Sequence, residues 1–244
     1  MPVMKAGPGR ALLGGGGNYN DLVMGTGPIA YWPQSETSGT VAHCLVNPAQ
    51  NGTYSSDVSL WTPGTGIGDG NTAPKFDGAA TFIDMFSAAF AAAFNHSEGS
   101  AMIWAKVDGA GVWTDATARY AWTVRRNVDN RMFVFKSATN NTLSSLHEGA
   151  TVMKTATAAG HSETVWTPWG MTWSVTGGTI IQYTGGAWDA ESVAGVTAWA
   201  GAPTAAYIGG YAGPTVVFDG WLSHLMLWDR VLAATEFAAL AVVP

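Results

Sequence analysis

The chain has 244 residues, a net charge of −6, 47% hydrophobic residues and only 11% charged residues, and no stretch approaches the ~18 apolar residues of a membrane span. Its 11 lysines and arginines are scattered, which argues against nucleic acid as a partner. The single cysteine, Cys44, excludes an intramolecular disulfide, and the first residues lack the apolar core of a signal peptide, so we expect no secretion signal.

Residues 1–27 hold eight glycines and few aromatic residues, which predicts a flexible N-terminal arm ahead of one domain over residues 28–244. A glycine-rich segment has little apolar surface to offset the entropy that it loses on ordering. The arm therefore docks on its own domain or, as we favour, on neighbouring subunits. The residues expected to make those contacts are Lys5, Arg10, Leu12, Leu13 and Tyr19.

Short stretches of alternating apolar residues follow along the chain and are typical of β-strands. Gly177-Gly178 permits the positive φ of a two-residue hairpin turn, and residues 127–130 indicate a second hairpin. Residues 62–74 are rich in glycine and proline and predict a loop. The expected strands cover residues 29–32, 79–82, 101–107, 120–124, 131–136, 169–175, 179–183, 206–209 and 220–228.

Two short helices are expected among these strands. Three phenylalanines recur at every fourth position of an alanine-rich stretch, which predicts a helix over residues 87–95 that begins at Asp84 or Ser87. Residues 235–242 predict a closing helix. Because strands and helices do not alternate, the sequence favours an all-β sandwich of ten or more strands.

The last expected strand, residues 220–228, is mostly apolar on both faces, so we expect both faces to be covered. Strict alternation divides its side chains between the two faces. One face would carry Trp221, Ser223, Leu225 and Leu227, and the other Leu222, His224, Met226 and Trp228. The same rule places Ile103, Ala105 and Val107 on one face of the strand at residues 101–107.

Several motifs follow one another in a characteristic order. They are YWPQSE at residues 31–36, NGTY at 51–54, FDG at 76–78, IWAK at 103–106 and FDGW at 218–221. Together, over residues 29–241, they resemble the concanavalin A-like jelly-roll superfamily, in particular its laminin-G-like modules. The resemblance implies a sandwich of two antiparallel sheets in which the chain after Trp228 folds back as a capping helix.

The sequence departs from that resemblance where carboxylates would stand. Many such modules have an acidic residue at the position of His43 that helps to hold calcium, and their closing strand carries acids where this chain has Ser223 and His224. Calcium takes about six to eight oxygen ligands, typically with carboxylates among them. We therefore expect no cofactor, and calcium stays an alternative that the loss of these carboxylates disfavours.

Catalysis is not expected from the sequence. Glycosidases on this fold carry two carboxylates close together on one strand. Asp189 and Glu191 come nearest to that spacing, but they follow a glycine turn in a segment typical of a solvated loop. The five histidines lack zinc-binding spacing. Glycoside hydrolysis stays a minor alternative.

Carbohydrate sites combine an exposed aromatic ring with nearby polar side chains. Three tryptophans in predicted loops fit this pattern, and two of them stand close to an aspartate. The candidate carbohydrate-binding residues are Trp113, Asp115, Trp188, Asp189 and Trp199. The alternative for each tryptophan is packing under a loop, as large aromatic side chains usually do.

The low charge, the arm and the lack of a secretion signal favour a chain that works inside an assembly. The modules that the sequence resembles occur without secretion signals in bacteriophage structural proteins, as capsid decoration or tail components. We therefore expect a virion protein that binds other virion proteins and copies of itself through its arm and sandwich surface. The main alternative is a lectin-like module for host glycans.

Overall fold

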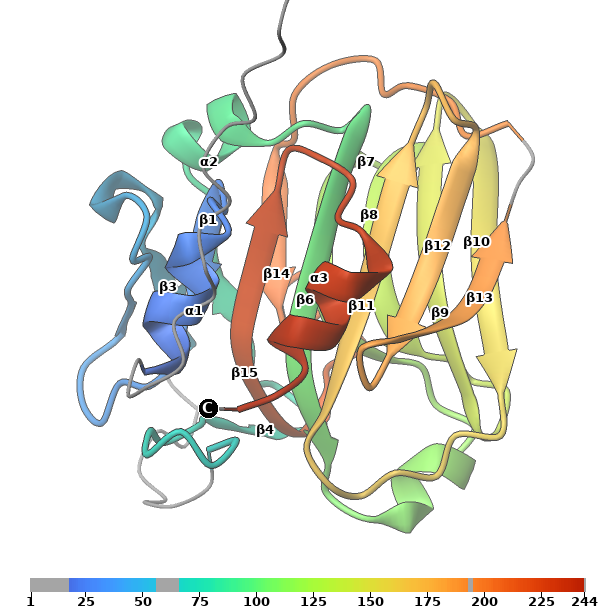
Figure 1. The fold of residues 1–244 in the computed structure, drawn as a ribbon. Coiled ribbons are helices and arrows are strands. Elements are labelled where there is room, and N and C mark those ends of the chain that lie inside the picture. Colours follow the sequence, from blue (N-terminus) through green and yellow to red (C-terminus); the bar gives the residue numbers. More distant parts are fainter. Residues whose placement is uncertain (1–17, 56–65, 193–194, 244) are drawn as a thin grey trace, which may run out of the picture.

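The computed structural model describes residues 18–55, 66–192 and 195–243 and confirms the predicted all-β sandwich. Two antiparallel sheets lie face to face with a hydrophobic core between them (Figure 1). Of the residues assigned to the arm, Lys5, Arg10, Leu12 and Leu13 lie outside the described residues.

The smaller sheet has seven strands. Six of them follow the order β1-β15-β6-β11-β12-β13, and β4 pairs with the first residues of β15. Their bounds are β1 (Ala30–Trp32), β4 (Lys75–Asp77), β6 (Glu98–Val107), β11 (Thr167–Ser174), β12 (Thr179–Thr184), β13 (Ala187–Ser192) and β15 (Asp219–Trp228).

The larger sheet has eight strands in the order β10-β9-β8-β7-β14-β5-β3-β2. One half of it is a run of four consecutive strands, β7 to β10, joined by hairpins. The bounds are β2 (Val41–Ala42), β3 (Gly52–Tyr54), β5 (Ile83–Asp84), β7 (Arg119–Asn127), β8 (Asn130–Lys136), β9 (Thr142–Gly149), β10 (Val152–Ala159) and β14 (Ala205–Ile208).

Short helices connect and cover the sheets. They are α1 (Tyr19–Gly25), α2 (Ala88–Ala93), α3 (Ala234–Leu240) and the 3-10 helices η1 (Pro48–Gln50) and η2 (Ala110–Thr114). Both predicted helices are confirmed. Ser87 is the N-cap of α2, and its side chain accepts a hydrogen bond from the backbone N–H of Phe90 at 3.0 Å. No described helix is long and apolar enough to cross a membrane.

Strand β6 shows how alternation builds the core. As predicted, Ile103, Ala105 and Val107 point into the space between the sheets, while Met102 and Trp104 point to the outer face of the smaller sheet. Indole rings fill much of the interior. Trp32, Trp122, Trp169 and Trp173 are all 0–1% exposed in this core.

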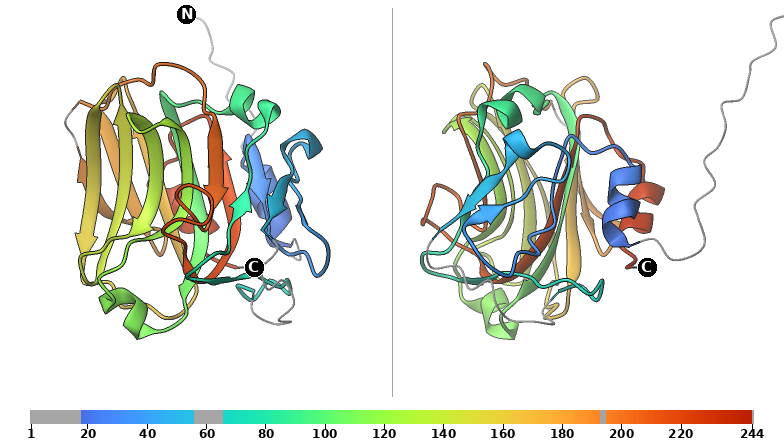
Figure 2. Two further views of the ribbon diagram at one scale, coloured as in Figure 1. Left: turned by 180° about the vertical axis from the view of Figure 1, so that it is seen from behind. Right: turned by 90° about the vertical axis from the view of Figure 1, so that its left-hand side faces the viewer.

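Helices α1 and α3 cover the outer face of the smaller sheet (Figure 2, right). Tyr19 is 1% exposed, donates its hydroxyl hydrogen to the Leu240 carbonyl at 2.6 Å and accepts the indole N–H of Trp104 at 2.7 Å. Tyr19 therefore belongs to the domain and is not available to a neighbouring subunit, which corrects its assignment to the arm. The reason is that Tyr19 and Val23, one helical turn apart, give α1 an apolar face.

Strand β15 is covered on both faces, as predicted, but strict alternation fails within it. Pairing with β6 shifts register between Ser223 and Met226, and His224 has a φ of 53°. Because of this bulge, Leu222 points into the core on the same side as Leu225 and Leu227. The prediction had placed Leu222 on the opposite face, so the assignment of faces is wrong before residue 224.

Two further predictions need correction. Residues 79–82 form a turn and not a strand, because the Asp77 carboxylate accepts the backbone N–H groups of Ala79, Ala80 and Thr81 at 2.9–3.1 Å. Burial alone would raise the pKa of Asp77, but these hydrogen bonds lower it to about 2. The expected strand ranges also missed the short strands β2, β3, β4 and β5 and the longer strands β9, β10 and β13.

Candidate binding face

Two of the three candidate tryptophans are buried, so they cannot form the exposed platforms that the sequence predicted. Trp113, 1% exposed, packs against the rings of His161 and Trp169. Trp199, 5% exposed, stacks on His96 with the ring planes 3° apart. Both indoles belong to the core between the sheets, where their apolar surface is removed from water.

Trp188 is 58% exposed, as a sugar platform requires, but Asp189 does not lie beside it. Successive side chains of a strand point to opposite faces. Trp188 pairs with Tyr183, whose ring packs on the outer face of the smaller sheet. Asp189 turns to the other side and accepts hydrogen bonds from Gln182 at 2.9 Å and Thr184 at 2.7 Å. The two residues therefore cannot hold one sugar together.

The segment that carries Asp189 and Glu191 is strand β13 and not the predicted loop. Gly185 and Gly186 have φ values of 62° and 81°, so they form a tight hairpin that returns the chain along β12. Asp189 also lies 3.2 Å from Nε2 of His161, so its carboxylate is engaged within the fold.

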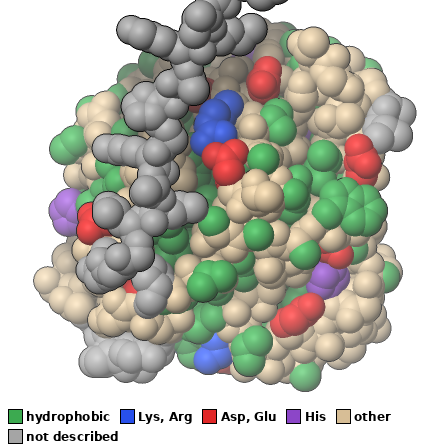
Figure 3. Space-filling model, in the orientation of Figure 1, with side chains coloured by type: hydrophobic (Ala, Val, Ile, Leu, Met, Phe, Trp, Pro, Cys, Tyr) green, Lys and Arg blue, Asp and Glu red, His purple; other side chains and the backbone are tan. Residues whose placement is uncertain are grey.

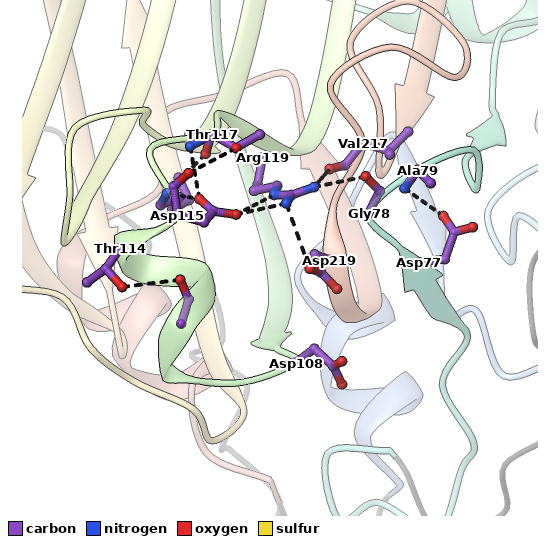
Figure 4. Close-up of polar contacts among 12 residues, drawn as sticks. Asp77, Gly78, Ala79, Asp108, Thr114, Asp115, Thr117, Arg119, Val217 and Asp219 are labelled. Atoms are coloured by element: carbon purple, nitrogen blue, oxygen red, sulfur yellow. Dashed lines mark hydrogen bonds and ion pairs between the residues drawn. The ribbon is translucent and has the colours of Figure 1, made fainter.

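Asp115 is also engaged within the fold (Figure 4). One carboxylate oxygen accepts two hydrogen bonds from the Arg119 guanidinium, at 2.8 and 3.2 Å, and the other accepts the Lys136 ammonium at 2.7 Å. Burial raises the pKa of Asp115, but the bonds from Lys136 and Arg119 outweigh burial and lower it. Because Lys136 is fully buried, it needs this carboxylate, which is not free to bind a sugar.

Arg119 is the centre of a structural cluster (Figure 4). Its Nη1 donates to the carbonyls of Gly78 at 2.9 Å and Val217 at 3.4 Å, and its Nη2 lies 3.8 Å from the Asp219 carboxylate. Burial is the main cause that raises the pKa of Asp219. The guanidinium thus ties β7 to the loops beside β4 and β15 and neutralises the nearby acids.

The position of His43 opens onto a pocket of about 380 Å³ that Glu36, Ser35 and Leu45 help to line. Glu36 accepts hydrogen bonds from the backbone N–H of His43 at 2.7 Å and from the Tyr54 hydroxyl at 2.6 Å. One carboxylate with two occupied oxygens is a poor donor set for calcium. In the described parts of the chain, no three His, Cys, Asp or Glu side chains gather into a metal site.

A cluster of aromatic rings lies on the outer face of the larger sheet. Met132 and Val134 of β8 point into the core, so Phe133 and Phe135 point outward. Phe133 is 3% exposed and forms the centre, with ring centroids 4.9 Å from Tyr120, 5.2 Å from Phe135 and 5.7 Å from Tyr211. Tyr120, Phe135 and Tyr211 are half-buried, so their outer surfaces remain accessible.

Tyr211 comes from the loop between β14 and β15, which stands out from this sheet (Figure 2, right). The Tyr211 ring lies over the hairpin of β7 and β8, and its hydroxyl accepts a hydrogen bond from Arg131. The loop therefore forms one wall above the sheet. We call the set Tyr120, Arg125, Arg131, Phe133, Phe135 and Tyr211 the aromatic face.

Two guanidinium groups border the rings of the aromatic face. Arg131 donates to Glu148 at 2.6 Å, which offsets its charge. Arg125 pairs with Arg131 across the hairpin and lies 5.4 Å from the centre of the Tyr211 ring. In residues 18–55, 66–192 and 195–243, no carboxylate lies within ion-pair distance of Arg125, so its charge is available to a ligand.

The sequence contained a signal for this face that the prediction did not use. Residues 131, 133 and 135 alternate with core positions along a strand that was correctly predicted, so an arginine and two phenylalanines must share one outward face. The contribution of Tyr211 was not visible, because it lies 80 residues beyond Arg131 in the chain.

No family model matches this sequence, and no curated protein matches it. Solved structures with a similar fold include the binding domain of botulinum neurotoxin serotype D, with a TM-score of 0.64 and 9% identity over 88% of this chain. This chain spans about half of the toxin domain, with 51% of that chain covered.

Two other similar structures come from sialidases. The CBM40 of the Ruminococcus gnavus IT-sialidase, bound to alpha2,3 sialyllactose, has a TM-score of 0.56 and 12% identity, covering 70% of this chain and 96% of that one. The Trypanosoma rangeli sialidase in complex with sialic acid has a TM-score of 0.62 and 15% identity, covering 87% of this chain and 32% of that one. At such identities the similarity establishes the β-sandwich fold alone.

Proposed function

We propose that this chain is a non-catalytic carbohydrate-binding module that holds an acidic glycan on the aromatic face. The observation that carries the proposal is the combination, on one face of the larger sheet, of three half-exposed rings with a guanidinium that has no carboxylate partner among the described residues. Aromatic rings stack on the apolar faces of sugars, and a guanidinium binds carboxylates and sulfates through charge-assisted hydrogen bonds. The sialic acid ligands of two similar folds support this choice of ligand class.

The test compares binding of 3′-sialyllactose and of lactose, which differ by the acidic sugar, by titration calorimetry. We expect sialyllactose to bind at least about tenfold more tightly, because a hydrogen bond to a charged group contributes ~1.5–3 kcal/mol. Arg125→Gln should abolish this preference and leave the weak binding of lactose. Tyr211→Ala should weaken both sugars, because it removes a stacking ring.

Trp188→Ala is the matched control, since Trp188 is an exposed aromatic residue on the other sheet. It should leave both affinities unchanged. Loss of binding in Trp188→Ala with full binding in Arg125→Gln would move the site to β13 and refute the proposal. Failure of every acidic glycan on an array to bind would refute it as well.

A second function, a structural component of a bacteriophage virion, is favoured by the low charge of the chain, 11% of residues. Uncharged side chains also predominate on the face that bears α1 and α3 (Figure 3). Removal of residues 1–17, which leaves α1 in place, should then abolish incorporation into particles. Normal incorporation of the shortened chain would contradict a role of the arm as anchor.

A further inference from the structure

Strand β10 is an open edge of the larger sheet, and it differs from the other edges of the sandwich. Strands β1 and β4 have three residues each, and β2 has two. Strand β13 is interrupted by a register shift and carries Asp189 and Glu191. Shortness, bulges and charges are the usual protection of a sheet edge against pairing with another chain.

Strand β10 has only one of these protections, the charge of Lys154. It runs for eight residues, pairs with β9 without a register shift, contains no proline and has Lys154 as its single charged residue. Figure 1 shows it at the side of the sandwich that lies away from α1 and β3. Without a partner, such an edge exposes a row of unpaired backbone groups, so this edge is suited to pairing with another strand.

The backbone groups on that edge can be assigned from the hairpin. Gly149 and Val152 flank a two-residue turn and therefore bond to each other, so alternate residues from Val152 onward bond to β9. The N–H and C=O groups of Met153, Thr155 and Thr157 then point away from β9. No backbone partner occupies them among the described residues, and the Met153 side chain is 54% exposed.

We propose that β10 pairs antiparallel with β10 of a second copy of this chain, about a twofold axis, so that the two larger sheets become continuous. Identical strands meet such an axis with complementary donors and acceptors. In the register centred on Thr155, Met153 lies opposite Thr157 and Lys154 lies opposite Ala156. This register brings apolar and small neutral side chains together and keeps the two copies of Lys154 from facing each other.

The geometry has a consequence for the aromatic face. Side chains that lie opposite each other across an antiparallel pair are on the same face of the sheet. The outer faces of the two larger sheets would therefore point in one direction. A surface that carries many glycans could then engage both copies at once, which raises the overall affinity without any new contact in each site. The pairing itself does not depend on glycan binding.

The test measures the mass of the full chain in solution by sedimentation equilibrium over a wide range of concentration. The wild-type chain should be a dimer, and the double substitution Met153→Lys with Thr157→Lys should raise the dimer dissociation constant at least about tenfold, because it sets like charges opposite each other. Met153→Glu with Thr157→Lys is the matched control, which places opposite charges across the same pair and should retain the dimer.

Both double variants change exposed or edge side chains, and equal thermal midpoints would show that the fold is retained. A wild-type chain that stays monomeric at every concentration would overturn the proposal. A dimer that survives both double variants with unchanged affinity would overturn it too, because the contact would then lie elsewhere.

Discussion

His147 gives the fold a built-in sensitivity to acid. It lies on β9, is fully buried, and its Nε2 is 3.1 Å from the carbonyl of His96, to which it donates. No hydrogen-bond partner satisfies Nδ1 among the described residues. Burial lowers the pKa of His147 from 6.5 to about 4, because a charged imidazolium would lose its hydration there. Replacement of His147 by glutamine, which does not titrate, should remove this sensitivity.

The magnitude follows from the two pKa values. The unfolded chain takes up the proton near pH 6.5 and the folded chain only near pH 4, so between these values acid favours the unfolded chain. The two pKa values differ by 6.5 − 4 = 2.5. This difference lowers the free energy of unfolding by about 3 kcal/mol between pH 7 and pH 4. That is a large share of the ~5–15 kcal/mol that stabilises an ordinary protein.

The assay is urea unfolding at pH 7 and at pH 4 for the wild type and His147→Gln. Carboxylates make the free energy of unfolding depend on pH in both proteins. The change between pH 7 and pH 4 is therefore compared between wild type and variant, and the difference gives the contribution of His147. From pH 7 to pH 4, we expect the free energy of unfolding to fall by about 3 kcal/mol less in the variant than in the wild type. His43→Gln, at a side chain that is 61% exposed, is the control and should behave as the wild type. Identical pH dependence in the wild type and His147→Gln would refute the reasoning.

Three further substitutions test the packing and the turns. Arg119→Ala should lower the free energy of unfolding in urea by about 2 kcal/mol, since it removes one of the two cations that contact Asp115 and the guanidinium beside Asp219. An unchanged value would show that the cluster is not structural. Gly99→Ala should lower the free energy of unfolding by about 2 kcal/mol and lower the thermal midpoint, because a Cβ there would lie 2.3 Å from the Trp173 ring and 2.6 Å from the Trp228 carbonyl oxygen. A variant of unchanged stability would mean that both the ring and the backbone of β15 can move aside. Ala150 and Thr151 both have positive φ, 48° and 73°, so Ala150→Asn with Thr151→Gly should add about 1 kcal/mol, measured by the same unfolding, and a loss would contradict the assigned turn.

Strands were predicted correctly where strongly apolar residues alternate with other residues or where a turn sequence marks a hairpin. Strand β6 and the hairpins β7–β8 and β11–β12 were found because their residues alternate or flank a glycine turn. Strand β9 was missed because serine, histidine and glutamate interrupt its apolar residues, although all eight of its residues are buried. Such a strand is defined by its two neighbours and not by its own sequence.

The candidate site was predicted less well than the fold, for a related reason. Whether an indole is exposed depends on what the rest of the chain places over it, so Trp113 and Trp199 could not be distinguished from Trp188 by sequence. The bulge at His224 is likewise a tertiary feature. Its ring lies 2.7 Å from the Tyr31 hydroxyl and 3.1 Å from the Asp69 carboxylate, two partners that are far away in the sequence.

The bond between Tyr19 and Leu240 holds the first and last helices together on the smaller sheet, opposite the loop that bears Tyr211 (Figure 2, right). A tag or fusion partner joined near residue 18 or residue 243 is therefore directed away from the aromatic face. Immobilisation near residue 18 or residue 243 would therefore leave the aromatic face turned towards the solution, so a sensor chip coated in this way would measure glycan capture without steric obstruction by the support.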